Sequence, residues 1–381
     1  MQRRDSALNH SLLKLALVGL VSLLLTACGG DTTEEYPTWD GQTPVCGEDG
    51  ILYGDAKMHL GDFSKYDLED EHVLRVHYDD GSVIEADISE TAFLSSCSII
   101  RGNIILAGQP ETIAVFDTIE EVDNISDGAG DQSYRPLGAG FGVADFPNLR
   151  RIEGGIYTEP HEIAGLNKLE YLGEPIHPNP ELITGLNALT VWNRDLSANS
   201  RWTGLQALER VNGDAIIGTP DDCSAFASFP SLKVITGKLY YSNSLCNGLP
   251  ALEEIGGSFE ANNPNGVVFP SLKRIGKTLF VSGRSGASDE DGIRLTIPFE
   301  LPMLEEVGGH VWIKGTMAET LVLPSLRRVE HWFFVVDNSR LEESSVELFR
   351  DQLDHYGTFV NCGNKNSECR QHDFPPTLDF D

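Results

Sequence analysis

The chain contains 381 residues, with 28 Lys plus Arg against 58 Asp plus Glu, so its formal net charge at pH 7 is -30. A hydrophobic fraction of 40% and a charged fraction of 23% are typical of a globular protein and exclude a disordered one. Nucleic acid and anionic membrane surfaces are bound through clustered Lys and Arg, which this acidic chain lacks, so neither is an expected partner. The 38 Gly and 19 Pro favour turns and short strands over long helices.

The N-terminus has the pattern of an export signal. Arg3 and Arg4 precede an apolar run over residues 15–25, which is too short to cross a bilayer but fits a signal peptide. The run ends in Leu25-Thr26-Ala27-Cys28, which resembles the lipobox of bacterial lipoproteins. This resemblance implies that Cys28 carries palmitate-type acyl chains and is the only membrane anchor. It also implies a place in the bacterial cell envelope, and Gly29 favours the outer membrane, facing the periplasm or the surface. An ordinary signal peptide with a chance cysteine is the alternative.

Six cysteines follow Cys28. An even number of cysteines in an exported protein predicts disulfides, because the compartment is oxidising. Proximity in sequence favours Cys46–Cys97, Cys223–Cys246 and Cys362–Cys369 among the connectivities that six cysteines allow. A zinc site is the alternative, but the sequence has no CxxC pair and its histidines are scattered, so we expect no metal and no cofactor.

A repeat of about 20 residues organises the middle of the chain. A four-residue motif begins at Phe146, Phe229, Phe269 and Leu323. It consists of Phe or Leu, then Pro, a variable residue and Leu. The central Leu of successive units stands at positions 149, 169, 189, 208, 232, 252, 272, 304 and 326. Ile or Val follows three residues later, then Gly, then a short segment in which apolar residues alternate. Such units are too short for a full helix and a strand, so each predicts one short strand of a parallel solenoid.

A residue that tolerates left-handed backbone closes each predicted strand. These residues are Asn243, Asn263, Gly283, Gly315 and Asp337. Asn, Asp and Gly adopt positive φ more readily than other residues do, so we expect the chain to turn a corner at each of them.

A resemblance to a known family is carried by Cys97-Ser98-Ile99-Ile100-Arg101-Gly102-Asn103-Ile104-Ile105-Leu106 and by the repeat units. This segment resembles the opening of the receptor L domain, the leucine-rich-repeat-like β-helix of insulin- and EGF-receptor ectodomains. The resemblance covers about residues 97–340 and implies a mainly β, right-handed parallel β-helix that serves extracellular recognition without catalysis. The chain lacks the cysteine-rich module of the receptors, so no receptor ligand-binding residue is transferred.

The segments outside the repeats predict two caps. Residues 73–88 alternate around Asp79-Asp80-Gly81, which is typical of a hairpin. Residues 342–356 predict a helix that presents Val346, Phe349 and Leu353 on one face and stops at Gly357. Polar insertions are expected at 123–145, at 283–295 and around residues 221–223. The expected organisation is a signal peptide at 1–27, an acidic tether at 28–45, an N-terminal cap at 46–96, the solenoid at 97–340 and a helical C-terminal cap with a tail at 341–381.

Strand alternation predicts a binding face. If the first residue of each strand points into the core, the next points outward, and a parallel ladder aligns these outward residues into one stripe. The stripe holds the candidates Tyr157, Tyr240, Phe280, Trp312 and Phe334, with His177, Ile216 and Glu260 at equivalent positions. Exposed aromatic residues in a row are typical of a surface that binds a protein or a glycan. The alternative is that an insertion or a cap covers the stripe and makes it a second small core.

Two other functional classes remain open. A β-helix polysaccharide lyase or hydrolase would need convergent carboxylates, whereas Glu253-Glu254 and Glu305-Glu306 occupy predicted exposed turns. No GxSxG, HExxH, P-loop or dinucleotide motif is present, so we expect no enzymatic activity. A purely structural role in the envelope is the third class. The acidic loops at 127–131 and 289–292 could bind calcium through clustered oxygen ligands, but they lack the spacing of an EF-hand. His310 and His331 form a pair without the third ligand that a metal site would need.

Overall fold

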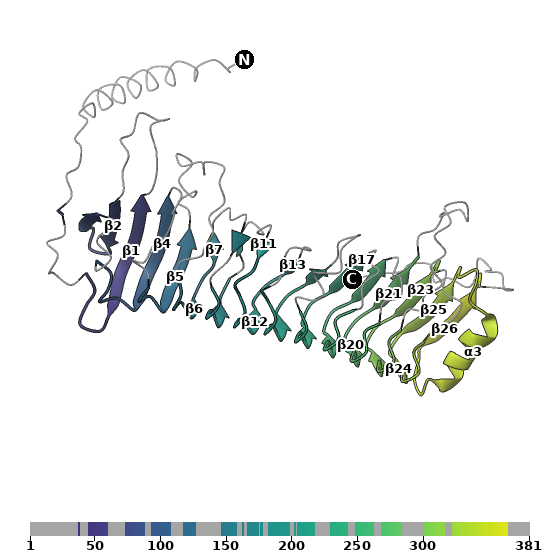
Figure 1. Ribbon diagram of the computed structural model, residues 1–381. Coiled ribbons are helices and arrows are strands. Elements are labelled where there is room, and N and C mark those ends of the chain that lie inside the picture. The colour runs from purple at the N-terminus through teal and green to yellow at the C-terminus, as the bar shows by residue number, and fades with distance from the viewer. Residues whose placement is uncertain are drawn as a thin grey trace, which may run out of the picture. The chain divides into compact units, whose positions relative to one another are not determined.

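The computed structural model describes most of the repeat region and parts of both ends. The chain divides into two compact units, Met1–Thr38 and Trp39–Asp381, and the strands and the helix given below all belong to the second (Figure 1). The described residues are 37–38, 45–59, 73–87, 93–107, 117–126, 146–157, 162–163, 166–174, 176–177, 182–198, 202, 204–217, 229–242, 248–262, 268–283, 300–316 and 322–364.

The second unit is a β-solenoid, as the repeat predicts. Its N-terminal sheet runs in the order β10-β7-β5-β4-β1-β2-β3, with β6 and β9 attached through β5. Two further strands, β8 and β11, pair with each other. The bounds are β1 Ile51–His59, β2 Val73–Tyr78, β3 Val83–Asp87, β4 Ile99–Ala107, β5 Glu121–Ser126, β6 Arg151–Ile152, β7 Ile156–Tyr157, β8 Glu162–Ile163, β9 Tyr171–Leu172, β10 Ile176–His177 and β11 Leu182–Ile183.

Two parallel sheets form the rest of the solenoid: seven coils contribute one strand to each sheet, and β26 adds an eighth strand to the wide sheet. The narrow sheet consists of two-residue strands: β12 Val191–Trp192, β14 Arg210–Val211, β16 Val234–Ile235, β18 Glu254–Ile255, β20 Arg274–Ile275, β22 Glu306–Val307 and β24 Arg328–Val329. The wide sheet consists of β13 Leu196–Ala198, β15 Ala215–Ile217, β17 Leu239–Ser242, β19 Phe259–Asn262, β21 Leu279–Ser282, β23 Val311–Lys314, β25 Trp332–Val336 and β26 Thr358–Cys362.

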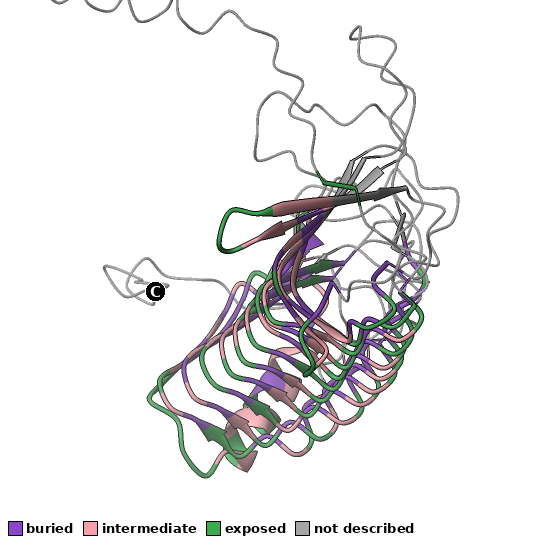
Figure 2. Ribbon diagram, turned by 90° about the vertical axis from the view of Figure 1, so that its left-hand side faces the viewer, coloured by how far each residue is buried: buried purple, intermediate pink, exposed green. Residues whose placement is uncertain are grey.

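The repeat motif fits this architecture residue by residue. All nine central Leu side chains are buried, and the residue three positions later is the buried end of a two-residue strand, as Ile275 is in β20. This residue is Ile or Val in seven units and Leu172 or Trp192 in the other two. The Gly that follows allows close packing between coils, because a Cβ on Gly276 would collide with the carbonyl oxygen of Gly256 one coil away. Buried and exposed segments therefore recur at the same places in successive coils (Figure 2).

The corners at the ends of the last wide-sheet strands are partly as predicted. Gly315 and Asp337 have φ of 64° and 57°, so both adopt the predicted left-handed backbone. The prediction is wrong for Gly283, whose φ is not positive; its small size matters instead, because a Cβ there would collide with the carbonyl oxygen of Gly315. Asn243 and Asn263 lie outside the described residues.

Buried amide groups join three of these corners. The Asn338 side chain donates to the carbonyl oxygens of Ile313 and Val336, at 3.1 and 3.0 Å. Its Oδ1 accepts from the backbone N–H and the hydroxyl of Thr316, at 2.9 and 2.8 Å. Asn364 continues the ladder, since its Oδ1 accepts from Asn338 Nδ2 at 2.9 Å. Because these groups are buried, the hydrogen bonds of Asn338 with Ile313, Thr316 and Asn364 fix one coil against the next.

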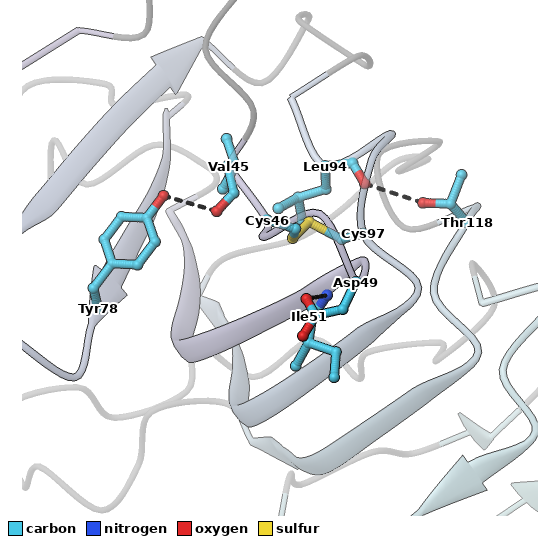
Figure 3. The surroundings of a disulfide bond; sticks show 8 residues. All are labelled: Val45, Cys46, Asp49, Ile51, Tyr78, Leu94, Cys97 and Thr118. Carbon is cyan, nitrogen blue, oxygen red and sulfur yellow. Dashed lines mark hydrogen bonds between the residues drawn. A yellow bond between two sulfur atoms is a disulfide. The ribbon is translucent and has the colours of Figure 1, made fainter.

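The N-terminal end contains the predicted hairpin and also the first strand of the parallel ladder. Strands β2 and β3 pair antiparallel around Gly81, whose φ is 85°. Strand β1, in the segment expected to be a cap, pairs in parallel with β4, so the parallel ladder already begins there. The predicted Cys46–Cys97 disulfide is confirmed, and Tyr78 donates its hydroxyl to the carbonyl oxygen of Val45 nearby, at 3.0 Å (Figure 3).

The C-terminal cap contains helix α3, Glu343–Gln352, beside β26 (Figure 1). Val346 is buried, and Phe349 and Leu353 are partly buried against the core, as predicted. The predicted end is wrong: the helix stops at Gln352 instead of continuing to residue 356. The backbone N–H groups of residues 354 and 355 donate to the carbonyl oxygen of Arg327, so this segment joins the coil below instead of the helix.

The structure contradicts the start of one predicted insertion, and other predicted loops lie outside the described residues. Residues 123–126, predicted as the start of a polar insertion, belong to β5, where Asn124 donates to Asn103 Oδ1 of the neighbouring coil at 2.9 Å. Both acidic loops, at 127–131 and 289–292, lie outside the described residues, and so do Cys223, Cys246 and Cys369. Cys362 is disulfide-bonded.

Candidate functional site

The outward residues of the wide sheet form a single in-register row, which we call the outward column. It consists of Ser197, Ile216, Tyr240, Glu260, Phe280, Trp312, Phe334 and Val360, each paired with the next on the neighbouring strand. Neighbouring strands of a sheet lie about 4.8 Å apart, so the column is a continuous stripe along the solenoid. The predicted alignment of Tyr240, Phe280, Trp312 and Phe334 is therefore confirmed.

The predicted exposure of the stripe is wrong at its C-terminal end. Trp312 is 7% exposed and Phe334 is fully buried, although both point away from the main core. They belong to a second hydrophobic cluster, separate from the main core, whose buried members are Trp312, Phe334, Val336, Val360 and Cys362. This half of the stripe is therefore a second small core, which is the alternative that the alternation pattern left open.

Aromatic rings fill the second cluster. The Phe334 ring contacts two indoles, with its centroid 4.8 Å from that of Trp312 and 5.3 Å from that of Trp332. Phe280 contacts the edge of the cluster, with its ring centroid 6.4 Å from that of Trp312. Such ring pairs contribute about 0.5–1.5 kcal/mol beyond the area that they bury, so this end of the column is a structural element.

The remaining part of the column is open, and we call Ile216, Tyr240, Glu260 and Phe280 the open face. Ile216 is 51% exposed, and the other three side chains are half-buried. Lys238 lies beside the column with its Nζ 2.9 Å from Glu260 Oε1, and this hydrogen bond raises the pKa of Lys238. The open face thus combines an aliphatic side chain, two aromatic rings and one ion pair on a flat sheet.

Tyr157, the fifth candidate, is not part of this row. It lies on β7 of the N-terminal sheet, in register with His177, and is 37% exposed. Its hydroxyl donates to the Glu174 carboxylate, and this hydrogen bond raises the pKa of Tyr157. A hydroxyl that is already paired with a carboxylate makes Tyr157 a surface residue of the N-terminal sheet.

The narrow sheet presents charged residues that neutralise one another from coil to coil. Lys273 Nζ lies 2.8 Å from Glu253 Oε2, and Lys233 Nζ lies 2.9 Å from Glu209 Oε1. A neighbouring row repeats the pattern, with Arg274 2.6 Å from Glu254. The acidic residues Glu209, Glu253 and Glu254, which follow a repeat Leu, are therefore solvated partners of basic residues.

A shallow pocket of about 290 Å³ lies on the N-terminal sheet and its turns. Glu121 in its wall accepts from Arg101 at 2.6 Å, and the Arg151 guanidinium lies 3.9 Å from the centroid of the Tyr171 ring. Glu170 opposite is 3.5 Å from Arg150. The carboxylates of Glu121 and Glu170 in this pocket thus each have an arginine partner.

His310 and His331 lie side by side, with ring centroids 5.2 Å apart. Burial, and then the proximity of His331, lower the pKa of His310, whose Nδ1 accepts from the backbone N–H of Trp332 at 3.3 Å. Within the described ranges, no group of three His, Cys, Asp or Glu side chains has the arrangement of a metal site. The two histidines thus form a pair at neighbouring coils.

Comparison with known proteins gives no family: no family model, no curated protein and no solved structure matches the chain. The likeness to receptor L domains stays a prediction that rests on the repeat units. In the part of the chain that the structure describes, no helix has both the length and the apolar character needed to cross a membrane.

Two features of the site were not predicted from the sequence. Lys238 precedes the strand that carries Tyr240, and only the coil geometry brings it to Glu260. Val360 and Cys362 in β26 join the second cluster, although no repeat unit predicts a strand there. The β-branched and aromatic residues Thr358, Phe359 and Val360 are a sequence signal for this last strand.

Proposed function

We propose that this protein is a non-catalytic recognition module of the bacterial cell envelope, which binds a partner through the open face. The single observation that carries the proposal is the in-register row of Ile216, Tyr240 and Phe280, which remains accessible on a sheet whose interior is fully packed. Accessible apolar side chains that line up on a rigid surface are the usual centre of an interface.

A protein partner fits this face better than a glycan does. Ile216, the most exposed member, is aliphatic and suits an apolar side chain of a partner. The Lys238–Glu260 ion pair at the margin would supply polar contacts of the kind found at the rim of an interface. A glycan is the second candidate, because Tyr240 and Phe280 flank Glu260, and aromatic rings together with a carboxylate also bind sugars.

The envelope location rests on the N-terminal signal and on the cysteines. The segment that ends in Cys28 has the pattern of a lipoprotein signal, and a lipid on this cysteine would tether the solenoid. The Cys46–Cys97 disulfide supports an oxidising compartment, where such bonds persist. A net charge of -30 would keep the body away from anionic lipid. Replacing Cys28 by Ala should abolish incorporation of a palmitate analogue; label retained on the variant would refute the anchor.

The two other classes have less support. A β-helix lyase or hydrolase needs unpaired carboxylates near one another, whereas the acids of the narrow sheet face Lys or Arg at salt-bridge distance. A purely structural role would be favoured by a column covered along its whole length, but Ile216 and its neighbours are accessible. Recognition is therefore the function that the described surface supports best.

The experiment that tests the proposal searches for the partner with a matched pair of variants. The purified chain is presented to a library of envelope and host surface proteins and, separately, to a glycan array. Ile216→Asp places a charge on the open face, and Leu348→Asp places one on the exposed side of α3, where Leu348 is 71% exposed. A specific partner should bind the parent and Leu348→Asp but not Ile216→Asp. Equal loss in both variants, or in neither, would contradict the open face as the site.

A further inference from the structure

A pocket of about 400 Å³ lies at the start of β1, next to the Cys46–Cys97 disulfide, and we call it the tyrosine pocket. The residues that line it include Val45, Glu48, Asp49, Ile51, Tyr53 and Tyr78, four of which are drawn in Figure 3. Its volume is typical of a small-ligand site, which measures about 300–1,000 Å³. The pocket belongs to β1, β2 and the turn before β1, so it shares no residue with the open face.

Two tyrosines from adjacent strands form the aromatic part of the pocket. Tyr53 directly precedes Gly54, whose register partner on β2 is Tyr78. Tyr78 is held in place, because its hydroxyl donates to the carbonyl oxygen of the buried Val45 at 3.0 Å. Tyr53 is 55% exposed, and its hydroxyl has no hydrogen-bond partner in the described part of the chain. The pocket therefore combines a fixed ring with an accessible one.

The turn before β1 forms the acidic part of the pocket. The backbone N–H of Gly50 donates to the carbonyl oxygen of Gly47 at 2.9 Å, and Gly50 has a φ of 75°. The Asp49 carboxylate accepts from the backbone N–H of Ile51 at 3.1 Å. Glu48 is exposed in the same turn and forms no ion pair with any described residue. Two carboxylates are thus held at the pocket, and that of Glu48 has no counter-charge there.

The surroundings add negative charge to the pocket. Burial, and then the charge of Asp80, raise the pKa of the Tyr78 hydroxyl. Arg101, the register partner of Tyr53 on β4, has its guanidinium 2.6 Å from Glu121 of the next coil, so its charge is already paired. The described lining contains no basic residue. Aromatic rings and carboxylates without a basic residue favour a ligand that carries positive charge.

We propose that the tyrosine pocket binds an organic cation of the alkylammonium class, with the ammonium group against the two rings and Glu48 as its counter-charge. The negative face of an aromatic ring attracts a cation, and the attraction grows when the cation is desolvated, as it is in a pocket. An inorganic cation would use the carboxylates without the rings, and a neutral sugar would use the rings without the charge. The inference concerns the N-terminal strands and does not depend on what the open face binds.

The charge of the ligand is tested with a matched pair of probes. Choline and its neutral isostere 3,3-dimethyl-1-butanol are titrated into the full-length chain by calorimetry. Choline should bind at least about tenfold more tightly, because only the cation is attracted by the rings and by Glu48. Equal affinity for the two probes, or no binding of choline, overturns the proposal.

Variants locate the binding at the pocket. Tyr53→Ala and Glu48→Gln should each weaken choline binding by about fivefold or more, whereas Tyr53→Phe keeps the ring and should bind as the parent does. Tyr157→Ala is the matched control, because Tyr157 is also an exposed tyrosine of the N-terminal sheet and lies beside the carboxylate of Glu174. Parent-like affinity in Tyr53→Ala, or equal loss in Tyr157→Ala, overturns the proposal.

A second measurement covers the case in which Tyr53→Ala does not fold, as judged by its melting curve. In the parent with ring-labelled tyrosine, the methyl protons of choline should show nuclear Overhauser effects to the Tyr53 ring, which is assigned through Tyr53→Phe. Absence of these effects at saturating choline overturns the proposal. Nα-acetyl-lysine amide, titrated in parallel, distinguishes the source of the cation. Tighter binding of choline supports a free amine as the ligand, and tighter binding of the lysine amide supports a lysine side chain of a partner.

Discussion

The guanidinium of Arg274 lies 2.6 Å from the carboxylate of Glu254, and the two residues are register partners on adjacent coils. Arg328 and Glu306 repeat this relationship farther along the narrow sheet, at 3.6 Å. Because the coils stack in register, a charge at one repeat position faces the same position of the next coil. The acidic repeats thus avoid stacking like charges on each other at these places.

This charge alternation predicts a swap experiment. Arg274→Glu should lower the melting temperature, because it places a third carboxylate between Glu254 and Glu306. The loss should shrink at high salt, which screens charges on the surface. Adding Glu254→Arg to the same chain restores an opposite pair and should recover part of the loss. A double variant no more stable than the single one would show that register pairing does not matter here.

The neighbouring pair adds a pH dependence. The hydrogen bond from Lys273 holds the pKa of Glu253 below its ordinary value of 4.5. A carboxyl whose pKa is lower in the folded state stabilises the fold above its unfolded pKa, and this contribution is lost as the pH falls through the folded pKa. NMR titration should find the Glu253 pKa below 4.5 in the parent and closer to 4.5 in Lys273→Ala. An unchanged value would rule out this ion pair in solution.

The two halves of the outward column should respond differently to truncation. Phe334→Ala removes a buried ring and should cost about 3–5 kcal/mol of unfolding free energy. Tyr240→Ala, on the open face, should cost only about 1 kcal/mol, as most substitutions outside a core do. Denaturant unfolding of both variants gives the comparison, and Trp312→Ala should follow Phe334→Ala. Similar losses at positions 240 and 334 would contradict the division of the column into open and closed parts.

The buried amide ladder should be sensitive to a single change. Asn338→Leu removes the acceptor of Thr316 and the donor to the Ile313 carbonyl, and each buried group left unpaired costs roughly 1–3 kcal/mol. Asn212→Leu is the matched control, because Asn212 makes a similar bond to Asn193, at 2.9 Å, on the exposed surface. Thermal unfolding should show a much larger loss for Asn338→Leu. Equal losses would mean that burial of the ladder contributes nothing.

The parts of the fold that the sequence predicts are those that repeat. The central Leu positions and the alternation in the wide-sheet strands follow from local pattern, so the solenoid and the alignment of Tyr240 with Phe280 are predictable. The end of α3 is not, because hydrogen bonds to Arg327 from the coil below decide it. Alternation likewise places Phe334 on the outer face but carries no information on what lies over that face.

The most direct test of the account is the affinity of the partner for three variants, measured by calorimetry with the full chain. Ile216→Asp and Tyr240→Ala alter the open face, whereas Leu348→Asp alters an exposed apolar residue of α3. The account predicts that the first two weaken binding by about 2 kcal/mol or more, as at the centre of an interface, with melting temperatures near that of the parent. Leu348→Asp should bind as the parent does. Parent-like affinity in Ile216→Asp and Tyr240→Ala would contradict the central claim.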